Sequence, residues 1–261
     1  MIISAIAKTT FLENIRQPVY LVLTLLGMAL IYCSQYVTMF VLGQETVTII
    51  DTAFVTVLTV GILVSIFSAS NLIYYEIESR TLMTVLSKPV KKEQIILGKF
   101  FGIVTAILLS SLILIGVLIL TAYLSTKSNQ DIVFDHVVLL YIIDVTVLTL
   151  GQLFIIVAVT ILFATTFPIT PTAVFTVLIF FLGHMVDLIK SNIQGNFLAD
   201  SFAFVYSLVV PNLEFFNLTQ ILYQGRAIDN IYIIQCTLYA GIYILIYLVL
   251  AMLLFARKDF S

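Results

Sequence analysis

Charged residues are scarce in this chain. Only 10% of its 261 residues are Asp, Glu, Lys or Arg, whereas 61% are hydrophobic and the mean hydropathy is +1.16. A soluble globular domain usually carries about 25% charged residues. The composition therefore excludes a water-soluble domain and predicts a protein that is embedded in a membrane.

Cysteine and histidine are also nearly absent. Cys33 and Cys236 are the two cysteines, and both fall in apolar stretches, where we interpret them as small buried residues rather than as a disulfide or a metal site. There are two histidines and no paired acidic motif. An intramembrane enzyme needs polar catalytic groups that converge at one depth, so we assign no catalytic residue and no metal ligand.

Long uncharged stretches are what the sequence has in abundance. No charged residue occurs at 17–44, 52–75, 100–126, 145–186 or 230–256. A hydrocarbon core about 30 Å thick needs about 20 apolar helical residues, so each stretch is long enough to cross it. The fourth is about twice that length. Pro168 and Pro171 near its middle predict a tight turn between two spans.

The predicted fold is all-α and integral to the membrane, with one transmembrane domain over residues 1–261. Because backbone groups in lipid must be satisfied internally, the spans are expected to be helices. We place six of them at about 18–42, 52–75, 95–124, 138–163, 171–188 and 231–255. Residues 1–17 are expected to form a helix on the cytoplasmic surface. The segment 189–229 is apolar at 202–210 over too short a length to cross, which favours an external re-entrant hairpin between spans five and six.

The basic residues are distributed unevenly about these spans. Nine of the twelve fall on one side: Lys8, Arg16, Arg80, Lys88, Lys91, Lys92, Lys99, Arg257 and Lys258. Lys and Arg accumulate in cytoplasmic loops, so both termini are predicted to be cytoplasmic and 189–229 external. No short apolar core with a small-residue cleavage site stands at the start of the chain, so we expect no removable signal peptide.

The densest cluster of charge lies between spans two and three. Two acids at its start suit the positive end of a helix dipole, and three apolar residues come next at helical spacing before a proline ends the helix. These residues are Glu76 and Glu78, then Leu82, Val85 and Leu86, then Pro89. The apolar stripe favours a short cytoplasmic helix that docks on a partner. The alternative is a loop that only anchors the topology through its basic residues, and the spacing alone leaves both open.

Three runs in this sequence together resemble the permease subunits of type-2 ABC exporters. The most specific is Glu76-x-Glu78-x-Arg80-Thr81-Leu82-x-x-Val85-Leu86-Ser87-Lys88-Pro89-Val90, with Ile96-Leu97-Gly98-Lys99-Phe100-Phe101-Gly102 after it. In that family this run is the coupling helix that docks on the ATPase. The other two are Pro211-Asn212-Leu213-Glu214-x-Phe216-Asn217, similar to the external segment after span five, and Phe255-Ala256-Arg257-Lys258-Asp259-Phe260, similar to the basic ending. The chain departs from the family at Lys91-Lys92, where relatives often have a small polar residue and Arg.

The resemblance covers the whole chain. It implies the permease subunit of an ATP-driven exporter of the bacterial cytoplasmic membrane, paired with an identical or sister permease. It also implies separate ATPase subunits that bind ATP and Mg. The implied coupling residues are Glu76, Glu78, Arg80, Thr81, Leu82, Val85, Leu86, Lys88 and Pro89.

We expect the chain itself to be no enzyme and to bind no cofactor and no nucleic acid. A phosphate-binding loop needs G-x-x-x-x-G-K-[ST]. Here Phe100 comes directly after Gly98-Lys99, and Glu93 stands where the first glycine belongs. Hydrolysis of ATP must therefore come from a separate polypeptide.

Polar residues within the spans are the candidates for a substrate pathway. A charge at the bilayer centre costs about 2.5–3.5 kcal/mol, so Asp144, near the outer end of span four, either reaches the headgroups or lines an outer vestibule. Gln152 and Asn71 can form hydrogen bonds across helices. His184 and Asp187 are three residues apart and can share a helix face.

Gly98 and Gly102, four residues apart at the start of span three, let another helix approach closely, which we interpret as packing rather than as a dimer contact.

Two other classes of function remain as alternatives. One is a secondary transporter driven by an ion gradient, although neither related halves nor ionisable residues near the midplane are evident. The other is an intramembrane lipid-modifying enzyme. The nearly uniform apolar character of the spans indicates a hydrophobic or amphipathic cargo.

Overall fold

The computed structural model describes residues 2–37, 45–71, 91–128, 136–192, 206–207, 209–217 and 229–257. Within these ranges the chain is helical apart from turns and short irregular pieces, and it has no strand. The predicted coupling residues, 76–89, lie outside the described residues, and so does much of the segment 189–229.

The helices of the described part are α1 (Ile2–Arg16), α2 (Pro18–Val37), α3 (Glu45–Ala69), α6 (Lys92–Ser128), α7 (His136–Ala164), α8 (Ile169–His184), α9 (Val186–Asn192) and α12 (Asn230–Ala256), with a 3-10 turn, η3 (Glu214–Phe216). Five of them, α2, α3, α6, α7 and α12, are long and apolar enough to cross a membrane. The 16 residues of α8 extend only about 24 Å at 1.5 Å per residue, which is short of a core about 30 Å thick.

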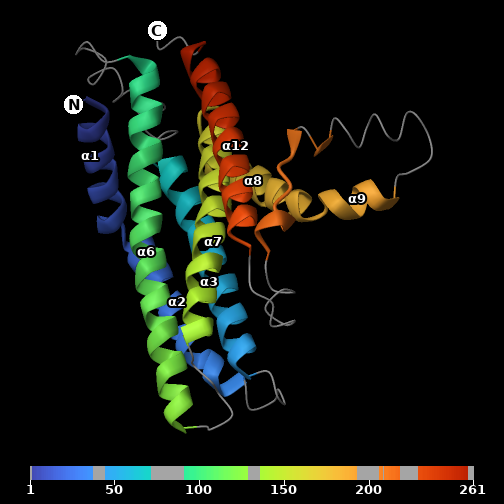
Figure 1. Ribbon diagram of the computed structural model, residues 1–261. Coiled ribbons are helices and arrows are strands. Elements are labelled where there is room, and N and C mark those ends of the chain that lie inside the picture. The colour runs from blue at the N-terminus through green and yellow to red at the C-terminus, as the bar shows by residue number, and fades with distance from the viewer. Residues whose placement is uncertain are drawn as a thin grey trace.

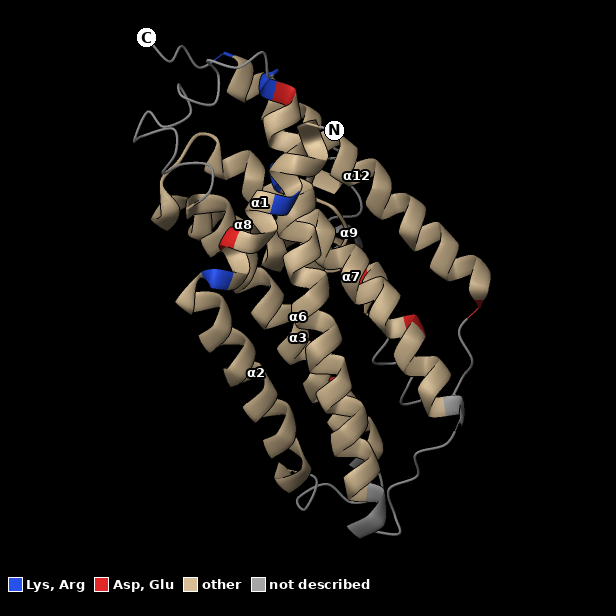
Figure 2. Ribbon diagram, turned by 90° about the vertical axis from the view of Figure 1, so that its left-hand side faces the viewer, with Lys and Arg blue, Asp and Glu red and all other residues tan. Residues whose placement is uncertain are grey.

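Figure 1 shows these elements as a bundle in which α6 is the longest rod. The beginning of α1, the beginning of α6 and the end of α12 lie at the same end of the bundle. There the Lys92 Nζ donates a hydrogen bond to the Ala256 carbonyl, at 3.2 Å. Figure 2 shows Lys and Arg gathered toward this end, where some acidic residues lie beside them, while other acidic residues lie farther along the bundle.

Helix α7 is deeply enclosed, because residues 155–159 are fully buried among its neighbours. In contrast, α2 and α12 each expose a row of large apolar side chains, such as Leu25 at 61% and Leu245 at 65%. In a membrane such a face needs no polar covering, because lipid is as apolar as leucine.

Three predicted spans, 95–124, 138–163 and 231–255, agree with α6, α7 and α12 to within four residues at each end. The predicted span 52–75 differs because α3 begins seven residues earlier, at Glu45. Asp51 therefore lies inside the helix rather than before it. An acid near the end of a membrane helix costs less than one at the bilayer centre, and counting uncharged residues alone overlooks this.

The predicted span 171–188 differs more. Pro168 is extended and precedes α8, while Pro171 lies in the first turn, where the helix needs no N–H donor. At the other end the helix stops at Met185, and α9 begins. The Gly183 carbonyl accepts a hydrogen bond from the Leu213 N–H at 3.0 Å, and a Cβ on Gly183 would lie 2.7 Å from the Leu213 side chain. The end of α8 is thus formed against a segment far along the chain.

The N-terminal helix α1 packs along the first part of α6, at Gly98 and Gly102. A Cβ added to Gly98 would lie 2.6 Å from Ile6 Cγ2, and one added to Gly102 would lie 2.5 Å from Thr10 Cβ. Both separations are too short for a side chain. The glycine pair is therefore an intramolecular packing surface that receives α1, which confirms the packing interpretation.

Candidate functional site

A cavity of about 660 Å³ lies between α3, α7 and α8, and η3 with the residue after it closes one side. Its polar lining residues are Asp51, Thr59, Tyr141, Thr149, Gln152, His184 and Asn217. Its apolar lining includes four phenylalanines: Phe54, Phe180, Phe181 and Phe216. The volume falls within the usual range of small-molecule sites, about 300–1,000 Å³.

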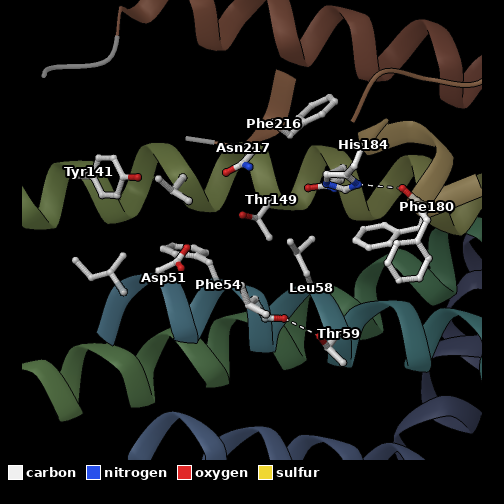
Figure 3. A pocket seen from close by; sticks show the side chains of 15 residues that line it. Asp51, Phe54, Leu58, Thr59, Tyr141, Thr149, Phe180, His184, Phe216 and Asn217 are labelled. Atoms are coloured by element: carbon white, nitrogen blue, oxygen red, sulfur yellow. Dashed lines mark hydrogen bonds between the residues drawn. The ribbon is translucent and has the colours of Figure 1, made fainter. Parts of the chain in front are cut away.

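The spacing of the lining residues along α7 explains why one face of this helix borders the cavity. On α7 the lining residues are Tyr141, Val145, Thr149 and Gln152, which are spaced by four, four and three and so occupy one helix face. The distance from Tyr141 to Gln152 along the helix axis is about 16 Å. Figure 3 shows the α7 side chains facing those of α3 across the cavity, with Asp51 and Tyr141 toward one end and His184 and Phe180 toward the other.

Gln152 and His184 form a hydrogen-bonded pair at the end of the cavity. The Gln152 Nε2 lies 3.2 Å from the His184 Nε2, and the His184 Nδ1 lies 2.9 Å from the Phe180 carbonyl oxygen. A carbonyl only accepts, so Nδ1 carries the proton and donates to it. The Gln152 amide contacts the other ring nitrogen, so both imidazole nitrogens have a hydrogen-bond partner.

Asp187 has a different partner from His184. The Asn212 Nδ2 donates to the Asp187 Oδ1 at 2.7 Å, and the Asn212 Oδ1 accepts from the Glu214 N–H at 3.1 Å. The Asn212 N–H also donates to the Tyr239 hydroxyl at 2.7 Å. Asn212 thereby ties together the start of α9, η3 and α12. The structure does not bring His184 and Asp187 into one pair.

A row of tyrosines on α12 holds the segment 206–217, which we call the tyrosine ladder. The Tyr232, Tyr243 and Tyr247 hydroxyls donate to the carbonyls of Phe215, Ser207 and Val209 at 2.7, 2.9 and 2.7 Å, and the Tyr239 hydroxyl accepts from Asn212. From the first to the last of these tyrosines is about 22 Å along the helix axis. Backbone carbonyls that face lipid or protein need donors, and these phenols supply them.

Tyr206 makes the reverse connection, from the segment to α8. Its hydroxyl donates to the Leu182 carbonyl at 2.7 Å. Burial raises the pKa of the Tyr206 phenol, so the hydroxyl stays protonated and remains a donor. The cavity wall at Phe216 is therefore attached to both α8 and α12.

The sequence model of one protein family, described as ABC-2 family transporter protein, matches residues 4–260. The chain belongs to the ABC-2 family of transporter proteins. This establishes the resemblance that the coupling run and the two shorter runs suggested. No curated protein matches the chain.

In this ABC-2 protein the two pathway candidates lie in different surroundings. Gln152 lines the cavity and is 2% exposed. Asp144 is half-buried on α7 but is not among the lining residues. Asn71 is exposed and is the last described residue after α3. The described residues contain no group of three His, Cys, Asp or Glu side chains able to hold a metal ion.

Sequence reasoning missed several residues of this ABC-2 cavity. Asp51 was placed before its span, and Tyr141 and Thr149 attracted no attention. For Tyr141 and Thr149 the available signal was their spacing with Gln152 on α7. Polar residues on one face of an apolar helix indicate a face that does not contact lipid.

Proposed function

We propose that this ABC-2 chain is the permease subunit of an ATP-driven exporter, which forms the translocation pathway and docks a separate ATPase. The observation that carries this proposal is the family match over residues 4–260 together with a membrane helix bundle. The run between α3 and α6 resembles the family's coupling helix, and the sequence lacks a phosphate-binding loop. ATP and Mg would be bound by the partner subunits, with two permease copies, identical or sister, in the assembly.

We further propose six crossings, with both termini in the cytoplasm. The cluster of basic residues at the end that holds the beginning of α6 and the end of α12 supports this orientation. The sixth crossing would be α8, whose 16 residues are short for a span on their own. Its end is bonded to Leu213 and its Leu182 carbonyl to Tyr206.

The tyrosine ladder supports a re-entrant segment at the external side. Tyr247 lies 17 residues from Asn230, the first residue of α12, or about 25 Å along the axis. Its hydroxyl bonds to the Val209 carbonyl, so this part of the segment lies deep beside a helix that crosses the membrane. In lipid, irregular backbone needs internal hydrogen-bond partners, which the α12 tyrosines provide.

The cavity between α3, α7 and α8 is the part of the chain best suited to a cargo. It is concave, lined mostly by apolar and aromatic side chains, and contains a few convergent polar groups. An intramembrane enzyme is less well supported, because the cavity histidine has both ring nitrogens occupied by Gln152 and Phe180.

Affinity purification of the tagged chain from its native membranes in a mild detergent tests the proposal. We expect a polypeptide with a G-x-x-x-x-G-K-[ST] loop to co-purify, and ATP hydrolysis to track that polypeptide rather than the chain alone. Transport driven by an ion gradient in vesicles that contain only this chain would instead establish a secondary transporter.

A further inference from the structure

We propose that a groove between α1 and α6 binds an anionic phospholipid, with Lys8 holding the headgroup phosphate and the exposed face of α6 holding an acyl chain. The inference goes beyond the permease function and does not depend on an ATPase. It derives from the composition of the groove, from its length along α6 and from the charge at one end.

The walls of the groove are apolar apart from two residues. The groove has a volume of about 480 Å³ and is lined by Ala7, Lys8 and Phe11 of α1 and by Thr105, Leu108, Leu109 and Leu112 of α6. The Thr105 hydroxyl lies 2.9 Å from both the Phe101 and the Gly102 carbonyl oxygens, so it is satisfied within α6. An extended polypeptide in this groove would find few hydrogen-bond partners, whereas an acyl chain needs none.

The length of the groove matches one leaflet of a membrane. Helix α1 lies beside the first part of α6 (Figure 1), and a Cβ added to Gly102 would be 2.8 Å from the Ala7 carbonyl oxygen. Lys8 is therefore close to the level of Gly102. Leu109 and Leu112 are about 10 and 15 Å farther along α6. A hydrocarbon core about 30 Å thick leaves about 15 Å to each leaflet, so Lys8 lies where a headgroup belongs when the chain follows α6.

The charge at this end of the groove comes from Lys8, which is exposed. Within the described part of the chain Lys8 forms no hydrogen bond or ion pair. The acid of α1, Glu13, does not line the groove and lies about 140° from Lys8 around the helix. A lysine lays its aliphatic stem along an apolar wall while its ammonium reaches the surface. That ammonium complements a phosphate and favours a headgroup with net negative charge over a zwitterionic one.

The groove is open to the bilayer along α6, which is one of the helices able to cross a membrane. Leu112 is 63% exposed and Leu109 is 36% exposed. A phospholipid can therefore enter sideways from the membrane. The overhanging α1 with its lysine distinguishes this place from other lipid-facing surfaces of the bundle.

Quenching of tryptophan fluorescence by brominated phospholipids, which acts on contact, tests the proposal. The chain contains no tryptophan, so Leu109→Trp places a single reporter in the groove. The full chain is reconstituted in phosphatidylcholine vesicles that contain a rising fraction of brominated phosphatidylglycerol or of brominated phosphatidylcholine with the same acyl chains. We expect the anionic lipid to reach half-maximal quenching at a fraction about fivefold lower, the preference that one lysine near a membrane surface contributes. Leu112→Trp, farther along the groove, is a second reporter and should show the same preference.

Leu238→Trp on α12 is the matched control, because Leu238 is 64% exposed and does not line the groove. Leu109 lies about 26 Å along α6 from Lys92, and Leu238 lies about 27 Å along α12 from Ala256. The Lys92 Nζ is bonded to the Ala256 carbonyl, so the two reporters are at similar distances from this end of the bundle. At Leu238 the two brominated lipids should quench equally. A preference of the same size there would reflect a general attraction of the anionic lipid and would overturn the groove as a site.

Variants at two lysines in the Leu109→Trp background assign the charge. Lys8→Gln should abolish the preference and Lys8→Arg should retain it. Lys91→Gln removes another exposed lysine at the same end of the bundle, outside the groove lining, and should change nothing. Equal quenching by the two lipids at Leu109, or a preference that survives Lys8→Gln, contradicts the proposal. Quenching at Leu238 but by neither lipid at Leu109 also contradicts it, because protein, such as a second permease copy, would then cover the groove.

Discussion

The Tyr247 hydroxyl on α12 donates a hydrogen bond to the Val209 carbonyl at 2.7 Å, across 38 residues of sequence. Tyr247 is 7% exposed, so its hydroxyl lies largely within the protein. The bond is one of four tyrosine hydrogen bonds by which α12 holds the segment 206–217 beside α8 and the cavity. The described residues 210–213 of that segment are irregular, and several of its backbone groups pair with side chains of α12.

Replacing Tyr247 with Phe tests this dependence. Tyr247→Phe keeps the ring and removes the hydroxyl, leaving the Val209 carbonyl without this donor. A buried polar group that loses its partner costs about 1–3 kcal/mol, so the free energy of unfolding should fall by that amount. Thermal unfolding of the purified chain in detergent measures the change. Tyr32→Phe is the control, because Tyr32 is 48% exposed on α2 and should be silent. Equal melting temperatures for both variants would contradict the proposed role.

The sequence was sufficient to predict most of the helices. Uncharged length and the paired prolines correctly predict α6, α7, α12 and the turn before α8. These are properties of one segment at a time, since a membrane helix satisfies its own backbone. The packing role of Gly98 and Gly102 could also be predicted, because a pair of small residues four apart is recognisable in the sequence of a single helix.

The end of α8 and the tyrosine ladder could not be predicted in the same way. The partners of the four tyrosines lie 17 to 38 residues upstream. Only the common helix face of those tyrosines was visible in the sequence. Gly183 and Leu213 likewise meet only in the folded chain. The cavity forms only where three helices and η3 pack together. The sequence therefore indicated Gln152 only as an isolated polar residue in a span, and it did not indicate Asp51 as a lining residue.

The contact between α1 and α6 should be sensitive to a single methyl group. In Gly102→Ala the added Cβ would lie 2.5 Å from Thr10 Cβ and 2.8 Å from the Ala7 carbonyl oxygen, so α1 must move. Overpacking of this kind costs about 1–3 kcal/mol. We expect a lower melting temperature and faster hydrogen exchange in residues 2–16.

The same helix offers a matched control for that change. A Cβ added to Gly116, also on α6, would meet nothing within 4 Å. Gly116→Ala should therefore leave α1 protected and, through the better helix propensity of alanine, stabilise the chain by up to about 1 kcal/mol. Identical exchange of residues 2–16 in both variants would contradict the packing described for α1.

The proposed topology can be tested with single cysteines at Ser128, Gln194 and Ser261, after Cys33 and Cys236 have been replaced. We expect an impermeant thiol reagent added to intact cells to label the first two positions and not the third, because the basic residues favour a cytoplasmic C-terminus. Permeabilised cells provide the control, in which all three should react. Labelling at Ser261 but not at Gln194 would reverse the orientation.

The coupling assignment concerns residues 76–89, which we predict to form a cytoplasmic helix that buries Leu82, Val85 and Leu86 in an ATPase. Burying a leucine contributes about 1.5–3 kcal/mol, and a charge in its place adds a desolvation cost. Leu82→Glu and Leu86→Glu should therefore weaken co-purification of the ATPase or uncouple hydrolysis from export. Insertion into the membrane should survive, because both positions lie outside every proposed span.

Two further variants make this test of the coupling helix specific. Thr84→Glu adds the same charge on the opposite face of the expected helix, about 200° from Leu82, and should leave assembly intact. Arg80→Glu should act in the same direction as the leucine variants but more weakly, since an exposed ion pair contributes little. If the run only anchors the topology, both leucine variants will assemble and export normally. In that case only the combined loss of Arg80, Lys88, Lys91 and Lys92 will matter, through an inverted orientation. Co-purification and export measured on the same membranes therefore decide between a docking helix and a simple basic loop.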